Sequence, residues 1–334
     1  MTTREKILAA LTATTSYVSG EELSRQCGIS RTAVWKQIQK LQEAGYQIEG
    51  QRRVGYRLLN GADVLNREEI CRALPDGFFG STEQIFCYEE IDSTNLEARR
   101  LILQGHGQGT VIVAERQTAG RGRLGRHWES PSGTGIWFSV ILEPGVSLQQ
   151  TSSYSFVMAV AVAEGIRQAT GLAAQVKWPN DVLLHGKKVC GILLELVAEM
   201  SQVHQLIAGI GINANQQLAD FPEEVQQKAI SLAAAAGHPV QRTSILCAVL
   251  QKIEENCLLL ERQGFDAIRE KWLSLSCVIG KEVQIVRQGD AILTGTAVGL
   301  GSDGSLQVQT AQGIEQVVAG DVSLRAADGS YFLL

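Results

Sequence analysis

Residues 110–128 read TVIVAERQTAGRGRLGRHW, and this stretch decides how the central part of the chain is interpreted. Its first six residues form a short apolar run typical of a buried strand. Three glycines and three arginines then interleave over residues 120–126. Glycines let the backbone approach a ligand closely, and guanidinium groups bind phosphate oxygens in pairs of hydrogen bonds. The loop therefore predicts a site for an anionic ligand; a solvated basic loop and an RNA-binding tract are the alternatives.

Strands alternate with longer helices on both sides of this loop, from about residue 80 onward, which is typical of a mixed α/β domain. Upstream, the predicted strand QIFCYEEI leads into DSTN at residues 92–95. Thr94-x-x-Glu97 has the spacing of a capping box, so we expect a helix to begin here. Its free backbone N–H groups, together with Ser93, Thr94 and Asn95, could bind a small polar ligand. Ordinary helix capping is the alternative.

Two further strands end in polar residues. In KWPND (177–181), Pro179 is expected to end a strand and to present Asn180 and Asp181 at its carboxyl end, where α/β sheets bind ligands. Lys187 and Lys188 follow on a hairpin strand and point to opposite faces, so only one of them can face the site. The strand QLIAGIGINAN ends near Asn213, whose amide could bind a base or a ribose or could only form a turn.

The first 60 residues have the pattern of a winged helix-turn-helix. Two predicted helical segments precede the tight turn at Gly28, and a third helix over residues 31–44 places Val34, Ile38 and Leu41 on one face. Alternating residues around a turn near 50–53 predict a two-stranded wing. Polar side chains of the third helix and the wing tip are expected to contact DNA: Ser30, Arg31, Thr32, Lys36, Lys40, Arg52 and Arg53.

Charge is distributed unevenly along the chain. The net charge is -5, but residues 1–60 hold nine Lys or Arg against five Asp or Glu, a local balance of +4, so the rest of the chain carries -9. The basic excess therefore lies in the predicted winged helix, where it suits neutralisation of DNA phosphates. A winged helix used only for protein contacts is the alternative.

The length of 334 residues exceeds that of one ordinary domain and fits two or three. The changes of pattern along the chain predict three domains, at 1–60, 61–275 and 276–334. After residue 275, short alternating segments with glycine turns predict a small SH3-like β-barrel. The seven cysteines show no C-x-x-C spacing, so neither a disulfide framework nor a zinc site is expected. The absence of a signal-peptide layout and of a long apolar run predicts a cytoplasmic protein without a membrane partner.

Five segments in this order and spacing resemble the biotin protein ligases: DSTN (92–95), RQTAGRGRLGRHW (116–128), KWPND (177–181), KVCGILLE (188–195) and GIGIN (209–213). With the helix-turn-helix in front and the small β domain behind, the whole chain resembles the bifunctional form that is both ligase and biotin operon repressor. The resemblance implies an α+β multidomain protein whose central domain has the fold of class II synthetases and biotin ligases.

The resemblance also implies an activity and its residues. Such enzymes join biotin and ATP into biotinyl-5'-AMP and transfer the biotin to a lysine of the biotin carboxyl carrier protein of acetyl-CoA carboxylase. Mg²⁺ is expected with ATP, with no protein ligands assigned. The catalytic residues would be Arg121, Arg123, Asp181 and Lys188. Biotin or its adenylate would contact Ser93, Thr94, Asn95, Gln117, Arg121, Gly122, Arg123, Trp128, Lys188 and Asn213.

Regulation follows from the same resemblance. The adenylate-loaded protein would form a homodimer that binds operator DNA upstream of biotin genes. Two alternatives remain: a ligase whose winged helix is not used for DNA, and a ligand-sensing repressor without turnover. A lipoate ligase would share the central fold, but GRGRLGR and KWPND favour biotin.

Overall fold

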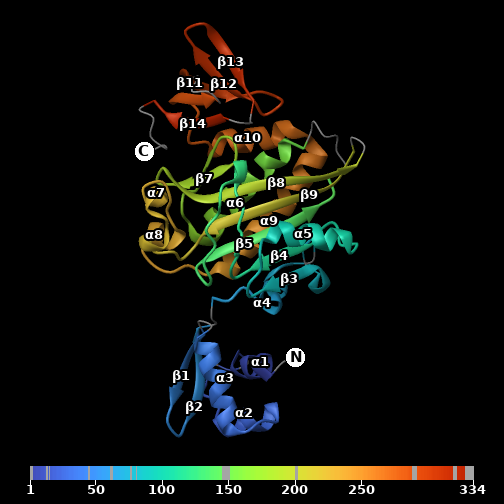
Figure 1. Ribbon diagram of the computed structural model, residues 1–334, viewed down its shortest axis with the longest axis vertical. Helices are drawn as coiled ribbons and strands as arrows, with labels where there is room; N and C mark the ends of the chain where they lie inside the picture. Colours follow the sequence, from blue (N-terminus) through green and yellow to red (C-terminus); the bar gives the residue numbers. More distant parts are fainter. Residues whose placement is uncertain are drawn as a thin grey trace. The chain divides into compact units, whose positions relative to one another are not determined.

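The computed structural model describes residues 3–12, 14, 16–43, 46–60, 63–75, 77–79, 81–144, 151–199, 202–287, 292–318 and 322–327. The chain divides into two compact units, Met1–Val64 and Leu65–Leu334, and each is described by itself (Figure 1). The domain boundaries expected at 60/61 and 275/276 stay predictions. Among the helices that the structure describes, none combines the length and hydropathy that a membrane span requires.

The first unit contains three helices and an antiparallel pair of strands: α1 (Thr3–Thr12), α2 (Gly20–Cys27), α3 (Arg31–Glu43), β1 (Gln47–Gln51) and β2 (Gly55–Asn60). Ser19 caps α2 through its side chain, and Gly28 ends that helix in the left-handed conformation, with φ of 66°. Val34, Ile38 and Leu41 lie in a small apolar core with residues of α1, α2 and β1. The predicted helix-turn-helix followed by a wing is confirmed.

The second unit is built on a seven-stranded sheet of order β3-β4-β5-β9-β8-β7-β6. Its strands are β3 (Ile85–Tyr88), β4 (Val111–Ala114), β5 (Gly135–Leu142), β6 (Gln175–Lys177), β7 (Asp181–Leu184), β8 (Lys187–Glu199) and β9 (Gln202–Asn213). Only β3 and β4 pair in parallel; the other neighbours are antiparallel. The mixed sheet agrees with the predicted α/β domain, and the hairpin predicted at residues 185–186 joins β7 to β8.

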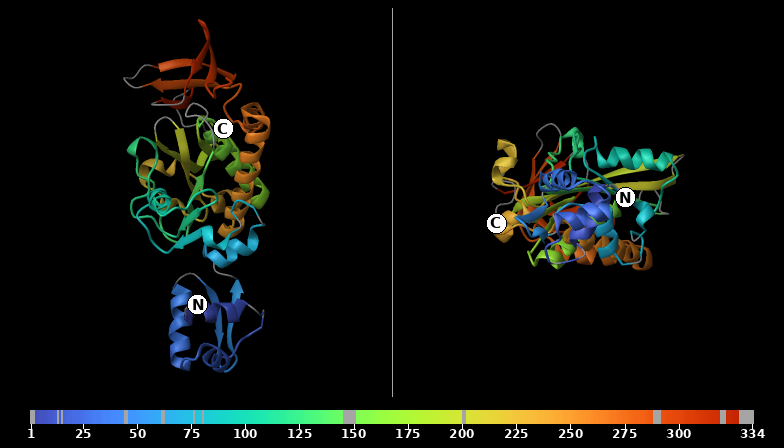
Figure 2. Two further views of the ribbon diagram at one scale, coloured as in Figure 1. Left: turned by 90° about the vertical axis from the view of Figure 1, so that its right-hand side faces the viewer. Right: turned by 90° about the horizontal axis from the view of Figure 1, so that it is seen from below.

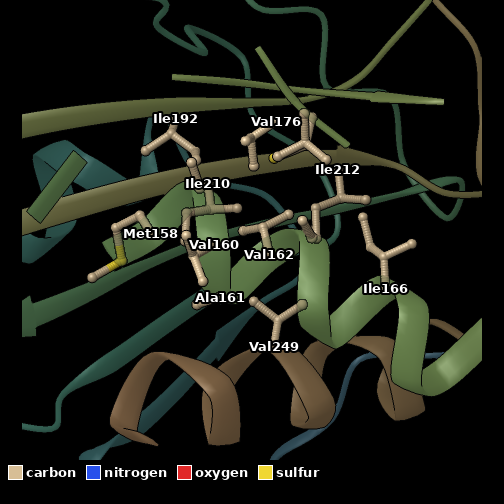
Figure 3. Packing of buried hydrophobic residues seen from close by; sticks show 14 of the residues in the cluster. Met158, Val160, Ala161, Val162, Ile166, Val176, Ile192, Ile210, Ile212 and Val249 are labelled. Atoms are coloured by element: carbon tan, nitrogen blue, oxygen red, sulfur yellow. The ribbon is translucent and has the colours of Figure 1, made fainter. Parts of the chain in front are cut away.

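Helix α6 (Ser153–Thr170) lies between this sheet and α9 (Arg242–Gln263). Most of its residues are buried, as expected for a helix that is apolar on all sides. Figure 3 shows its side chains between the sheet residues Ile210 and Ile212 and Val249 of α9. Gly165 allows the two helices to approach closely, because a Cβ atom there would lie 2.7 Å from the Cα of Val249.

The other helices of this unit are α4 (Arg67–Ala73), α5 (Thr94–Leu103), α7 (Glu223–Gln226), α8 (Leu232–Ala236) and α10 (Phe265–Leu275). Helix α5 covers part of the opposite face of the sheet, where Ile207 packs with Ala98 and Leu101. Along β9, the even positions Ala208, Ile210 and Ile212 belong to the core on the α6 side. The odd positions after Ile207 are Gly209 and Gly211, so α5 leaves a hollow over this end of the sheet.

The end of the chain forms a five-stranded antiparallel sheet of order β13-β12-β11-β10-β14 (Figure 2). Its strands are β10 (Glu282–Arg287), β11 (Ile292–Leu300), β12 (Leu306–Thr310), β13 (Gly313–Val317) and β14 (Val322–Ala326). The SH3-like barrel is not confirmed, because the edge strands β13 and β14 do not pair within the described residues. The turn between β11 and β12 packs on the central domain, where Trp178 Nε1 donates to the carbonyl of Gly304 at 3.1 Å.

Candidate functional site

A cavity of about 580 Å³ occupies the hollow beside α5. Its walls come from the start of α5, the arginine-glycine loop, the β6–β7 turn, strands β8 and β9, residues 221–229, and Leu324 and Arg325 of the last strand. All four predicted catalytic residues and all the predicted ligand-binding residues lie in this lining. Segments separated by more than 200 residues in the sequence therefore converge on one site.

Glycines form the floor of this cavity. Gly191 on β8 pairs with Gly211 on β9, and Gly209 lies two residues before Gly211 on the same face. A Cβ atom at Gly209 would lie 2.1 Å from Asn95 Oδ1, and one at Gly211 would lie 2.5 Å from Trp128 Nε1. Any larger side chain at Gly209 or Gly211 would overlap with Asn95 or Trp128. The GIGIN segment therefore alternates between core isoleucines and cavity glycines, a role that its spacing alone did not reveal.

The DSTN segment forms a polar network rather than a capping box. Ser93 is the N-cap of α5, but its side chain makes no capping hydrogen bond. The backbone N–H and the hydroxyl of Thr94 both donate to Gln117 Oε1, at 2.9 and 3.2 Å. Ser139 of β5, a residue that sequence reasoning missed, donates to Asn95 Oδ1 at 2.6 Å. The network fixes the orientation of these side chains at one end of the cavity.

Two buried donors at the cavity have no partner within the described residues. They are Asn95 Nδ2 and Trp128 Nε1. Native proteins rarely leave buried donors unsatisfied, because each such group costs about 1–3 kcal/mol. A ligand with acceptor oxygens at this end would remove that cost. Trp128 also packs edge-to-face on Trp137, with ring centroids 6.4 Å apart, so it belongs to both the core and the site.

The arginine-glycine loop places its guanidinium groups along the cavity wall. Arg123 begins a short 3-10 turn and donates to Asn180 Oδ1 at 2.9 Å. Asn180 donates in turn to the carbonyl of Ile192 at 2.6 Å, so strand β8 supports the position of Arg123. Arg121 is more exposed, and Arg126, which sequence reasoning did not assign, also lines the cavity.

Asp181 and Lys188 form an ion pair across the β7–β8 hairpin, with Oδ1 and Nζ 2.6 Å apart. Lys188 Nζ also lies 5.4 Å from the centroid of the Trp128 ring, within the range of a cation–π contact. Lys187 does not line the cavity, so the expectation that only one of the two lysines faces the site agrees with the structure.

Lys177 is a further cation of the site that the sequence reasoning missed. It lies on β6 opposite Asp181 and is almost fully buried. Desolvation lowers the pKa of its ammonium group to about 8, and the charge of Asp181 partly opposes this shift. The signal was a lysine between the buried residues Val176 and Trp178, where an aliphatic residue is usual.

Asn213 lines the cavity, but protein groups already engage its amide. Asn213 Nδ2 donates weakly to the carbonyls of Lys188 and Ile230, at 3.4 and 3.3 Å. The N–H of Lys188 donates to the carbonyl of Lys228 at 2.7 Å. These bonds tie residues 221–230 to strand β8. Phe221 and Lys228 of that segment reach the cavity and had not been assigned.

The predicted DNA-contact residues all lie on the surface of the first unit. Ser30 Oγ accepts from the N–H of Ala33 and so caps α3. The others are exposed on α3 or in the β1–β2 turn: Arg31, Thr32, Lys36, Lys40, Arg52 and Arg53. Trp35 of α3 is also exposed and was not assigned from the sequence.

The described residues contain no group of three or more His, Cys, Asp or Glu side chains that could hold a metal ion. All seven cysteines are free thiols. Burial raises the pKa of the Cys87 and Cys257 thiols to about 12, so these groups stay protonated at neutral pH.

Comparisons with protein families match three parts of the chain. The Biotin/lipoate A/B protein ligase family matches residues 88–213, a helix-turn-helix (HTH) domain matches residues 3–57, and the Biotin protein ligase C terminal domain matches residues 278–325. A solved structure of the biotin protein ligase from Aquifex aeolicus in complex with biotin and ATP is similar, with a TM-score of 0.65 and 35% identity. The match covers 73% of this chain and all of that one.

Curated relatives match over nearly their full lengths. The biotin--[acetyl-CoA-carboxylase] ligase of Paracoccus denitrificans is 34% identical over 69% of this chain and 96% of its own. The bifunctional ligase/repressor BirA of Bacillus subtilis is 39% identical over 92% of this chain and 94% of its own. The chain therefore belongs to the biotin protein ligase family, in the bifunctional ligase/repressor form that carries an N-terminal helix-turn-helix domain.

Proposed function

We propose that the cavity joins biotin and ATP into biotinyl-5'-AMP, releases pyrophosphate and then transfers biotin to a lysine of biotin carboxyl carrier protein. The chain is a biotin protein ligase by family, and its cavity lining combines polar side chains with cationic ones. The observation that carries the proposal is that one lining holds both groups of residues. The polar group includes Asn95 and Gln117, and the cationic group includes Arg123 and Lys188. The Trp128 ring lies beside the second group, with its centroid 5.4 Å from Lys188 Nζ.

The polar side chains of the cavity suit the ureido ring of biotin. This ring carries a carbonyl acceptor and two N–H donors, so it requires a site with both kinds of group. Asn95 supplies a free donor, and the Ser93 hydroxyl forms no hydrogen bond with a described residue, so it is available to the ligand. Gly209 and Gly211 leave room for the side chains of Asn95 and Trp128 to pack closely on the sheet at this cavity. These properties support the assignment of Ser93, Thr94, Asn95 and Gln117 to biotin.

The cationic side chains of the cavity suit adenylate formation. A carboxylate oxygen of biotin attacks the α-phosphorus of ATP, a new O–P bond forms, and the bond to the leaving pyrophosphate breaks. Two anions 4 Å apart repel each other by about 4 kcal/mol at an effective dielectric constant of 20. Arg121, Arg123 and Lys188 offset this repulsion and bind charge that develops in the transition state. Mg²⁺ would be held mainly by the phosphates of ATP.

Transfer requires an unprotonated acceptor lysine. The amine attacks the biotinyl carbonyl, an amide bond forms, AMP leaves, and one proton must be removed. A lysine has an unperturbed pKa of about 10.4, so a base near the site assists this step. Asp181 is the proposed base. Its partner Lys188 can exchange the Asp181 carboxylate for the adenylate phosphate, which would leave Asp181 with one cationic partner fewer when it accepts the proton.

The experiment that tests this assignment separates the two half-reactions in Asp181→Asn. Biotin-dependent exchange of pyrophosphate into ATP reports adenylation, and single-turnover transfer from preformed adenylate to the carrier protein reports ligation. Loss of a general base predicts a transfer rate about 10²-fold lower and a smaller loss in exchange. Equal losses in both assays would instead make Asp181 an organiser of Lys188. Biotin and ATP binding without AMP formation in the wild type would favour a sensor without turnover.

We also propose that the first unit binds operator DNA when the adenylate is bound, as a homodimer that spans two half-sites. The basic side chains exposed on α3 and in the β1–β2 turn support this role. Gel shifts with the DNA upstream of biotin genes, with and without biotin and ATP, test it. Absence of salt-sensitive binding in both conditions would leave only the ligase.

A further inference from the structure

Trp35 is the most exposed tryptophan of the chain. Half of its surface is exposed (50%), whereas Trp137, Trp178 and Trp272 are fully buried. It forms no hydrogen bond, ring contact or cation–π contact with any residue that the structure describes. Single exposed apolar side chains are common on protein surfaces, so exposure alone does not identify a site. The neighbours of Trp35 on the helix distinguish it from such a residue.

Trp35 lies on the basic, solvent-facing side of α3. Arg31 and Thr32 precede it by four and three positions, so they lie on the same face of the helix. Lys36 and Lys40 are exposed on the adjoining face. The apolar residues Val34 and Ile38 hold α3 in the core, so Trp35 lies at the border between the buried face and the basic face. Trp35 is thus a large apolar group surrounded by groups that suit an anionic partner.

The wing repeats this arrangement. Among the described residues of the first unit, the other large apolar side chain that is exposed is Val54. It follows Arg52 and Arg53 in the β1–β2 turn, and both arginines are exposed. Exposed apolar groups therefore occur in this unit beside its basic groups, which is the composition expected of a surface that binds both phosphates and bases.

We infer that Trp35 reads DNA sequence by packing its indole ring on the 5-methyl group of a thymine in the major groove. The inference rests on the DNA-binding function proposed above. Phosphate contacts from arginine and lysine fix position but carry no sequence information. A winged helix-turn-helix places the N-terminal part of its recognition helix on base edges, and the thymine methyl is the apolar group that the major groove presents. Trp35 is the fifth residue of α3.

The test uses DNA that the full chain selects from a random-sequence duplex pool in the presence of biotin and ATP. The selected duplex is then remade with deoxyuridine in place of each thymine in turn, which removes only the 5-methyl group. Binding constants are measured for the wild type, for Trp35→Ala and for the matched control Lys36→Ala. Biotin-dependent AMP formation and thermal melting check that each variant is folded.

At one thymine or more, methyl removal should weaken wild-type binding about tenfold and leave binding by Trp35→Ala unchanged within twofold. Lys36→Ala should keep the full methyl effect and instead reduce the slope of log K against log salt by about 0.9. On random-sequence duplex, Trp35→Ala should bind like the wild type.

A methyl effect that persists in Trp35→Ala, or the absence of any methyl effect in the wild type, would overturn the inference while leaving DNA binding in place. If Trp35→Ala changes only the dimerisation of the adenylate-bound protein, the inference is overturned in favour of a protein contact. A wild type that selects no DNA would overturn both the inference and the proposed repressor function.

Discussion

The cavity of the second unit and the basic surface of the first both contain lysines and arginines, but in opposite environments. In the cavity, Lys188 is paired with Asp181 and Lys177 is buried. On the surface, Lys36 and Lys40 are exposed and form no ion pair with a described residue. Charges held out of water interact strongly with one another and with a ligand, whereas exposed charges are screened and act nearly additively. Single substitutions should therefore have large effects in the cavity and small effects on the surface.

Arg123→Ala should give the largest effect, and it tests most directly whether cations of the cavity matter more than cations of the surface. Removing a preorganised group that stabilises developing charge predicts a loss of about 10²- to 10³-fold in biotin-dependent pyrophosphate release. The matched control is Arg116→Ala in the same loop, whose guanidinium pairs with Glu90 on the surface and does not line the cavity. Near-normal release in Arg123→Ala would mean that cavity arginines are as dispensable as surface ones.

Gly209→Ala tests whether the shape of the cavity, in addition to its charge, makes it sensitive to single substitutions. The new Cβ would lie 2.1 Å from Asn95 Oδ1, so Asn95 or strand β9 must shift. Overpacking of this kind costs about 1–3 kcal/mol, which predicts biotin binding about tenfold to a hundredfold weaker by calorimetry. Gly20→Ala in the first unit is the control, since its nearest neighbour would lie at 3.6 Å. Unchanged biotin affinity in Gly209→Ala would remove the glycine floor from the binding site.

The buried Lys177 should make the stability of the protein depend on pH in a way that exposed lysines do not. Its pKa is about 8 in the folded protein and about 10.4 in an unfolded chain, so between these values the unfolded state binds more protons. Stability of the ligand-free protein should therefore rise as pH increases from 8 to 10, by on the order of 3 kcal/mol for this group. Chemical denaturation at several pH values should show that Lys177→Met removes this rise. Lys187→Met, outside the cavity, should keep it; loss of the rise in both variants would argue against a special role for Lys177.

Lys40→Ala should give the smallest effect. Loss of one phosphate contact predicts DNA binding weakened a few-fold at moderate salt and a log–log salt slope shallower by about 0.9. The change should be the same for operator and random-sequence DNA. A loss confined to one sequence would place Lys40 on a base edge, and an unchanged slope would remove it from the DNA surface.

The sequence predicted the positions of Asp181 and Lys188 because strand alternation and a tight hairpin determine which residues share a face. It did not reveal Lys177, because the desolvation of one lysine depends on what packs around the strand. The sequence shows the glycines of GIGIN, but it does not show that they line the cavity, because that depends on which part of the sheet α5 covers. The capping-box spacing at Thr94 was misleading, since Ser93 is the N-cap and Thr94 is the first residue of α5. Trp35 was not assigned, because helical periodicity identifies the buried face and does not single out one exposed apolar residue.

The contact between Trp178 and Gly304 has a consequence for how this protein can be divided. Gly304 adopts φ of 81°, and a Cβ atom there would lie 2.6 Å from a ring carbon of Phe156, so the β11–β12 turn is fitted closely to the central domain. A chain truncated after Leu275 would leave Trp178 and Phe156 facing water and would remove Leu324 and Arg325 from the cavity wall. The last strands therefore cannot be exchanged as a module between homologues unless these contacts are transferred with them.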